Sequence, residues 1–296
     1  MRIVRFRDRL GAPRAGVLDT GADGAGDTIV TLRQSIADLL ALPADDVREI
    51  CSNPGRGEVV PLERAELLAP VDGQTEVWAA GVTYERSRTA RMAESENSAS
   101  IYDRVYDAER PELFFKSAAW RVAGPGAPVS VRADSTVNVP EPELAAVLNS
   151  AGEVVGYTIC NDMSSRSIEG ENPLYLPQAK IYLGGCAAGP WIRPAWEIPD
   201  PYALAMSLTI MRGGAEAWNG TASTGGLRRR VPELASYLFR EDDFPGGVLL
   251  STGTSLVPDL PFTIQPGDEV RITISSIGEL ANPVVLGKAA ARAGVG

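Results

Sequence analysis

VPEPELAAVLNSAGEVVGYTICND, residues 139–162, contains two mostly apolar segments separated by a short turn that carries Gly152. Two such segments around a glycine-containing turn predict a β-hairpin. We centre the turn between Ala151 and Gly152, which fixes the register of the two strands. Pro140 and Pro142 each lack a backbone donor, so we expect the first strand to lie at a sheet edge or at a bulge.

Three carboxylates fall on one face of this predicted hairpin. In the chosen register Glu141 is opposite Asp162 and Glu143 is opposite Cys160, and side-chain alternation then places the three carboxylates together. Directly opposed β carbons lie about 4.5–5.5 Å apart and diagonal ones about 7–8 Å, so the three groups can meet at one point. A hard divalent cation removes their repulsion, and an oxygen-only ligand set favours Mg²⁺ or Mn²⁺ over zinc. The alternative is a solvated polar face, which is the usual explanation of an isolated Glu-x-Glu pair.

The rest of the chain is organised around short strands. From about residue 75 onward, Gly and Pro turns separate apolar segments, and residues 204–210 and 270–274 alternate as half-buried strands do. Residues 231–238 are the clearest helix candidate in this region. We therefore predict an α+β fold in which residues 71–296 form a mixed β-roll or β-sandwich.

Residues 1–70 are predicted to form a small N-terminal α+β domain. Residues 3–6 favour a strand. Thr31 and Gln34 have the spacing of a capping box, and apolar residues at helical spacing follow until Pro43. This pattern predicts one amphipathic helix packed on a short sheet.

Composition excludes several classes of function. The formal charge of −10 argues against a nucleic-acid partner, and the one dense basic run, Arg228–Arg230, is too short to change that. No signal-peptide pattern and no run of about 20 apolar residues occurs, so we expect no membrane partner. Three cysteines without zinc-site spacing favour a reducing compartment, and we predict a cytoplasmic protein.

The chain has no histidine. Mechanisms that need a Ser-His or Cys-His pair, or imidazole ligation of zinc, are therefore closed to it. Acid–base chemistry must use carboxylates, lysine, tyrosine, thiol or water.

Several motifs together resemble the fumarylacetoacetate hydrolase superfamily over roughly residues 75 to 288. They are Val139-Pro-Glu-Pro-Glu-Leu144, Gly156-Tyr-Thr-Ile-Cys-Asn-Asp-Met-Ser-Ser-Arg166, Gln178-Ala-Lys180, Gly253-Thr254 and Gly267-Asp-Glu-Val270. The resemblance implies a mixed β-roll catalytic domain, and it implies that Glu141, Glu143 and Asp162 bind Mg²⁺.

Three further segments are similar to the branch of 2-keto-3-deoxy-pentonate dehydratases, which the chain resembles along its whole length. They are Gly81–Arg88, Arg110–Lys116 and Ile168–Lys180. This implies conversion of a 2-keto acid, 2-dehydro-3-deoxy-D-arabinonate, to 2,5-dioxopentanoate and water, by a homo-oligomer that is a dimer or a tetramer. The hydrolases of the superfamily use a His beside a Glu to activate water, so the lack of histidine argues against that activity.

A dehydration of this kind predicts roles for particular residues. A divalent ion polarises the keto group and so makes the C3 proton acidic. We expect Lys180 to be the base, because a partly desolvated lysine near a dication should have a lowered pKa. Glu112 is the candidate acid for the departing C4 hydroxyl. The resemblance also assigns five residues to substrate binding: Ser87, Arg88, Lys116, Lys180 and Thr254.

Non-functional alternatives exist for three of these residues. Lys180 could be a surface lysine, Glu112 a loop carboxylate, and the Gly-Thr turn before Thr254 an ordinary tight turn. At the level of function, an acylpyruvate hydrolase, an oxaloacetate decarboxylase or a 2-hydroxy-dienoate hydratase would share the metal site. A metal-binding homologue without catalytic activity is the remaining hypothesis.

Overall fold

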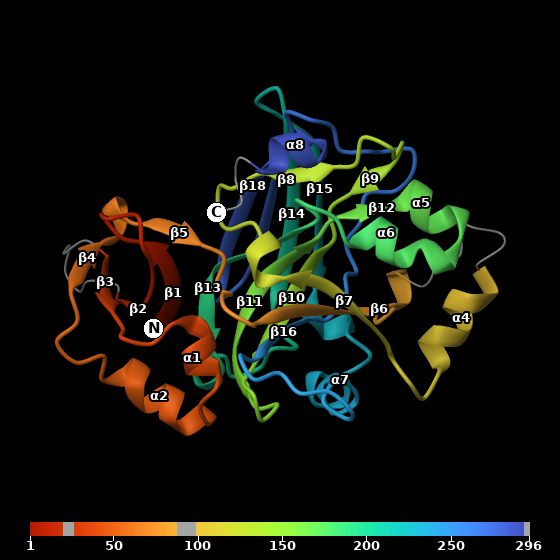
Figure 1. Ribbon diagram of the computed structural model, residues 1–296. Helices are drawn as coiled ribbons and strands as arrows, with labels where there is room; N and C mark the ends of the chain where they lie inside the picture. The colour runs from red at the N-terminus through yellow and green to blue at the C-terminus, as the bar shows by residue number, and fades with distance from the viewer. Residues whose placement is uncertain (20–26, 88–98, 293–296) are drawn as a thin grey trace.

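The computed structural model of the protein describes residues 1–19, 27–87 and 99–292. A sheet of eleven strands runs through the molecule, and a sheet of five strands packs on one of its faces (Figure 1). The predicted α+β class, dominated by mixed sheets, is confirmed. None of the helices in the described residues is both long and apolar enough to cross a membrane.

The large sheet contains strands from both predicted regions, residues 1–70 and residues 71–296. Its strands, in spatial order, are β4 (Val59–Pro61), β3 (Thr28–Thr31), β2 (Pro13–Asp19), β1 (Arg2–Arg7), β13 (Cys186–Pro194), β11 (Val154–Asp162), β10 (Pro142–Leu148), β16 (Val248–Ser251), β6 (Glu76–Gly81) and β7 (Glu112–Ala118), and β5 (Glu66–Leu68) pairs with β1.

The second sheet and the helices cover this framework. The five strands are, in order, β15 (Ala215–Ser223), β14 (Ala205–Arg212), β17 (Glu269–Ile274), β18 (Gly278–Leu286) and β8 (Val129–Val131), and a separate short pair joins β9 (Asn138–Val139) to β12 (Ser164–Ser165). The helices are α1 (Ile36–Leu40), α2 (Ala44–Ser52), α4 (Ala99–Asp107), α5 (Arg166–Glu171), α6 (Leu176–Lys180), α7 (Val231–Leu238) and α8 (Gly287–Ala291). The segments predicted at 204–210, 231–238 and 270–274 are thus confirmed as β14, α7 and β17.

Strand β10 is buried on both faces. Leu144 and Leu148 pack in a cluster with the inner face of the five-stranded sheet. Ala145 and Val147, on the opposite face, pack in a cluster that contains apolar residues of α1 and α2. Each fully buried leucine contributes roughly 1.5–3 kcal/mol, so the strand that carries the acidic residues is held from both sides.

The predicted hairpin is formed by β10 and β11 in the expected register. Glu143 pairs with Cys160, and the backbone N–H of Asp162 donates to the carbonyl of Glu141 at 2.9 Å. A bulge between Val147 and Leu148 shifts the register by one residue next to the turn, away from the acidic end.

The expected edge position of the first hairpin strand is wrong, because β10 lies between β11 and β16. Pro142 is tolerated there as the first residue of the strand, since β16 pairs only with residues 145–148. The missing proline donors therefore fall where no ladder bond to β16 is required.

The N-terminal region differs in detail from the prediction. Thr31 does not cap a helix, because it ends β3 and its hydroxyl donates to the Glu58 carbonyl. Ser35 is the N-cap of α1 and forms a capping box with Asp38. Strand β1 extends the large sheet by pairing with β13, and the domain boundary at residue 70 stays a prediction.

Candidate metal centre and active site

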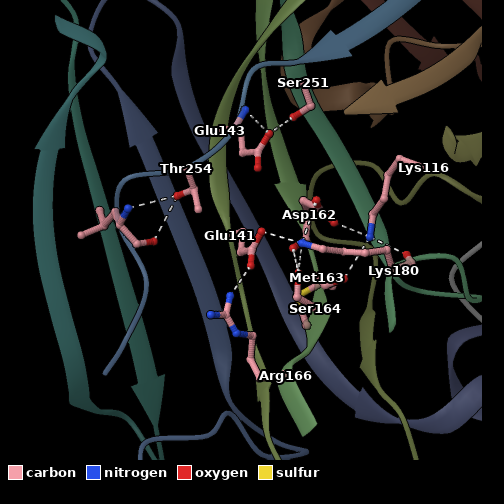
Figure 2. A network of polar contacts seen from close by, with 12 residues as sticks. Lys116, Glu141, Glu143, Asp162, Met163, Ser164, Arg166, Lys180, Ser251 and Thr254 are labelled. Carbon is pink, nitrogen blue, oxygen red and sulfur yellow. Dashed lines mark hydrogen bonds and ion pairs between the residues drawn. The ribbon is translucent and has the colours of Figure 1, made fainter. Parts of the chain in front are cut away.

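Three buried carboxylates meet at the open end of the hairpin (Figure 2). Glu143 lies on β10, Asp162 ends β11, and Glu141 immediately precedes β10. One carboxylate oxygen of each lies within 4.8 Å of the others, and none of the three residues is more than 3% exposed. In the part of the chain that the structure describes, this is the one group of at least three such side chains that could hold a metal ion.

Glu143 is held by neighbours on the next strand and turn. Its Oε2 accepts from the Ser251 hydroxyl at 2.5 Å and from the Gly253 backbone N–H at 2.7 Å. Burial, followed by the charges of Asp162, Cys160 and Glu141, raises the pKa of the Glu143 carboxyl well above its usual value. A nearby cation favours the charged form of a buried carboxylate and so lowers its pKa.

Gly253 approaches this carboxylate in a conformation that favours glycine. Its φ is +91°, and a β carbon here would lie 2.0 Å from the Thr83 Oγ1 atom. The turn before Thr254 is therefore not an ordinary tight turn, because its backbone N–H serves a predicted metal ligand.

Lys180, the last residue of α6, lies among the carboxylates (Figure 2). Its Nζ donates to Glu141 Oε2 at 2.6 Å, to Asp162 Oδ2 at 3.1 Å and to the Ser164 hydroxyl at 2.5 Å. Its side chain is 2% exposed, which excludes the surface-lysine alternative. The other carboxylate oxygen of Glu141 accepts from the buried Arg166 at 2.9 Å.

Lys116 contacts Asp162 at Oδ1, whereas Lys180 bonds to Oδ2. The Lys116 Nζ is 2.5 Å from Asp162 Oδ1 and donates to the backbone carbonyls of Met163 at 2.9 Å and of Lys180 at 2.5 Å. The described residues that line the cavity do not include Lys116. The substrate contact predicted for Lys116 stays a prediction.

The three carboxylates line a cavity that has three walls. β6 and β7 contribute one wall, α5 and α6 the second, and the segment after β16 the third. The lining residues are Ala80, Gly81, Val82, Ser87, Glu112, Phe114, Glu141, Glu143, Asp162, Arg166, Glu169, Leu176, Lys180, Gly253, Thr254 and Val257. The α5–α6 wall stands beside the β9–β12 pair at one end of the hairpin (Figure 1).

Most of the predicted site residues come together around this cavity. Glu112, Ser87 and Thr254 line it along with Lys180 and the carboxylates. The Ser87 hydroxyl donates to the Tyr84 carbonyl at 2.9 Å, and the Thr254 hydroxyl bonds to the backbone of Leu256 within its own turn. Arg88 lies outside the described residues.

Other residues of the site were not predicted as site residues. Arg166 and Ser251 each bond to a carboxylate of the cluster, and Glu169 lines the cavity. Arg166 and Glu169 fall in segments that carry the family resemblance, which is the signal that could have found them. Ser251 carries no such signal, because only the pairing of β16 with β10 brings it to Glu143.

The donor set suits a hard divalent cation. All three groups are carboxylates, and three protein ligands leave coordination positions for water or for a bidentate substrate, as Mg²⁺ or Mn²⁺ requires. Lys116, Lys180 and Arg166 form ion pairs with Asp162 and Glu141.

Comparison with known proteins places the chain among related enzymes. Residues 76–285 match the family model of the fumarylacetoacetate (FAA) hydrolase C-terminal domain. The chain is 51% identical over 215 residues, 73% of each chain, to a probable 2-keto-3-deoxyxylonate dehydratase of Haloferax volcanii. It is 47% identical over 223 residues, 74% of each chain, to the 2-dehydro-3-deoxy-D-arabinonate dehydratase of Saccharolobus solfataricus.

A solved structure shares the whole fold. A crystal form of 2-keto-3-deoxyarabinonate dehydratase is 37% identical to the chain and superposes with a TM-score of 0.82, over 97% of this chain and 99% of the other. The complex of 2-keto-3-deoxy-D-arabinonate dehydratase with magnesium and 2,5-dioxopentanoate is 36% identical, with a TM-score of 0.81 over the same shares.

Proposed function

The chain belongs to the fumarylacetoacetate hydrolase family, and on this premise we propose that it is a magnesium-dependent dehydratase. Its reaction is the conversion of 2-dehydro-3-deoxy-D-arabinonate to 2,5-dioxopentanoate and water. The observation that carries this proposal is the buried carboxylate triad with Lys180 beside it, on a chain that is 51% and 47% identical to two such dehydratases over 73% and 74% of its length.

The substrate presents a carboxylate and an adjacent keto oxygen, which together would suit chelation of a divalent ion. When bound to Glu141, Glu143 and Asp162, Mg²⁺ or Mn²⁺ supplies Lewis-acid polarisation of that keto group. The protein's own groups then move the protons. The proposed acid, Glu112 on β7, and the proposed base, Lys180 on α6, lie on different walls of the cavity.

We assign the base to Lys180, which removes the C3 proton of the substrate, and the acid to Glu112, which protonates the departing C4 hydroxyl. Loss of one proton and one hydroxide leaves a double bond between C3 and C4 and releases one water. Proton transfers that move the unsaturation to C5 then give the aldehyde of 2,5-dioxopentanoate. Ser87, Arg88 and Thr254 are proposed to bind the substrate.

A substrate panel tests this function. Purified protein with Mg²⁺ should convert 2-dehydro-3-deoxy-D-arabinonate to 2,5-dioxopentanoate, and chelation of the metal should stop the reaction. The product is identified by mass spectrometry and by its aldehyde. Acylpyruvates, oxaloacetate and a 2-hydroxy-dienoate complete the panel as substrates of the alternative activities. Turnover of one of these alone would overturn the dehydratase proposal, and no turnover of any 2-keto acid would favour the non-catalytic homologue.

We also propose that the protein is a cytoplasmic homo-oligomer, a dimer or a tetramer. The resemblance to the 2-keto-3-deoxy-pentonate dehydratases supports this proposal, and the exposed apolar residues Trp120 and Leu174 are candidates for the contact between subunits. Analytical ultracentrifugation should give two or four times the mass of 31.4 kDa. A single species at the mass of one chain, at all concentrations, would contradict the proposal.

A further inference from the structure

We propose that Lys116 is a positioning residue, which holds the metal ligand Asp162 and the base Lys180 in fixed relation to each other. The inference rests on the proposed function for the roles of those two residues. Lys116 itself is assigned no contact with substrate or metal.

The contacts of its ammonium group carry the proposal. Lys116 extends from β7, and its Nζ meets a carboxylate oxygen at the end of β11, the carbonyl of the next residue, Met163, and the carbonyl at the end of α6. Two donors of the ammonium bond to the backbone carbonyls, and its charge forms an ion pair with Asp162 Oδ1 at 2.5 Å. One side chain on β7 thus contacts both the end of β11 and the end of α6.

The two contacts to the catalytic segments differ in kind. At Asp162 the ammonium takes Oδ1, whereas the other oxygen, Oδ2, accepts from Lys180. At Lys180 the ammonium binds the backbone carbonyl and leaves that residue's own Nζ among the carboxylates. Lys116 therefore fixes where each group points without occupying either reactive end.

The choice of residue type supports a geometric role. Of the 28 basic residues in the chain only three are lysines: Lys116, Lys180 and Lys288. Two of the three are buried at this site, in a chain that otherwise uses arginine. Lysine offers three donors around one compact centre, whereas the planar guanidinium of arginine cannot aim at three oxygens converging on a single point.

A positioning role and a simple counter-charge predict opposite effects on metal binding. If Lys116 only balanced charge, its removal would make the site more negative, and Mg²⁺ would bind more tightly. If Lys116 orients Asp162, its removal should weaken Mg²⁺ binding roughly 10- to 100-fold, as loss of an outer-shell partner does.

Lys116→Met tests this, because methionine has a similar length and no donor. We expect Mg²⁺ binding measured by calorimetry without substrate to weaken by about 10- to 100-fold, with a fall in kcat at saturating Mg²⁺. Lys288→Met is the matched control at an exposed position and should match the wild type in both. Circular dichroism and thermal unfolding show whether each variant is folded. Unchanged or tighter Mg²⁺ binding by folded Lys116→Met would overturn the proposal.

A second measurement uses the wild-type protein and does not depend on a variant's folding. Reductive methylation followed by peptide mass spectrometry should modify Lys288 and leave Lys116 unmodified, with and without a bound 2-keto acid, because the Lys116 side chain is 0% exposed. Modification of Lys116 that the keto acid prevents would show substrate contact instead and reject the inference. The Mg²⁺ calorimetry and the methylation are both made without turnover, so an inactive wild type would reject the proposed function and leave these two tests in force.

Discussion

Replacing Glu143 with Gln should abolish magnesium-dependent turnover while the fold is retained. The amide has nearly the shape of the carboxylate, and its oxygen can still accept from Ser251 and from the Gly253 N–H. What it lacks is the negative charge that Mg²⁺ requires of its ligand. We expect kcat/KM to fall at least about 1,000-fold, equivalent to roughly 4 kcal/mol, together with a large loss of Mg²⁺ affinity. Full activity in the variant would remove Glu143 from the ligand set.

The same variant has a distinct effect on the metal-free protein. Because the folded pKa of Glu143 is raised, its contribution to stability is fully present below the unfolded value of about 4.5 and is lost as pH rises through the folded pKa. Glu143→Gln cannot ionise, so in EDTA it should become more stable than the wild type as pH increases. Melting temperatures of both proteins between pH 5 and pH 9 check this. If the melting temperatures of the two proteins change with pH in parallel, the pKa of the Glu143 carboxyl is not raised in the folded protein.

The sequence was informative wherever a local rule decides the structure. Strand alternation and one turn position were enough to place Glu143 opposite Cys160 and to bring the three carboxylates together. The alternating strands at 204–210 and 270–274 followed from the same rule. These features depend on neighbours within a hairpin or within one strand.

The supporting contacts depend on long-range pairing that no local pattern encodes. Ser251 is 108 residues from Glu143, and it arrives only because β16 pairs with β10. The same pairing makes β10 a central strand, which is why the edge position expected from the two prolines was wrong. The motif around Lys116 predicted a substrate contact, whereas the position of β7 places its ammonium 2.5 Å from Asp162 Oδ1.

Replacing Lys180 with Met should separate catalysis from metal binding. Loss of a positioned base costs typically 10²- to 10⁴-fold, so kcat should fall by at least about 100-fold, and exchange of the C3 hydrogens with deuterated water should be lost with it. Mg²⁺ affinity should increase, because the Lys180 ammonium donates to oxygens of Glu141 and Asp162 that the cation also needs.

The two buried lysines are therefore expected to have opposite effects on Mg²⁺ affinity. Lys116 touches the oxygen of Asp162 that faces away from Lys180, so it supports the ligand, whereas Lys180 competes with the cation for ligand oxygens. Calorimetry on folded Lys116→Met and Lys180→Met should therefore give Mg²⁺ affinities displaced in opposite directions from the wild type. Lys180→Met with kcat within tenfold of the wild type, or with undiminished C3 exchange, would require a different base, and Glu112 would be the first to test.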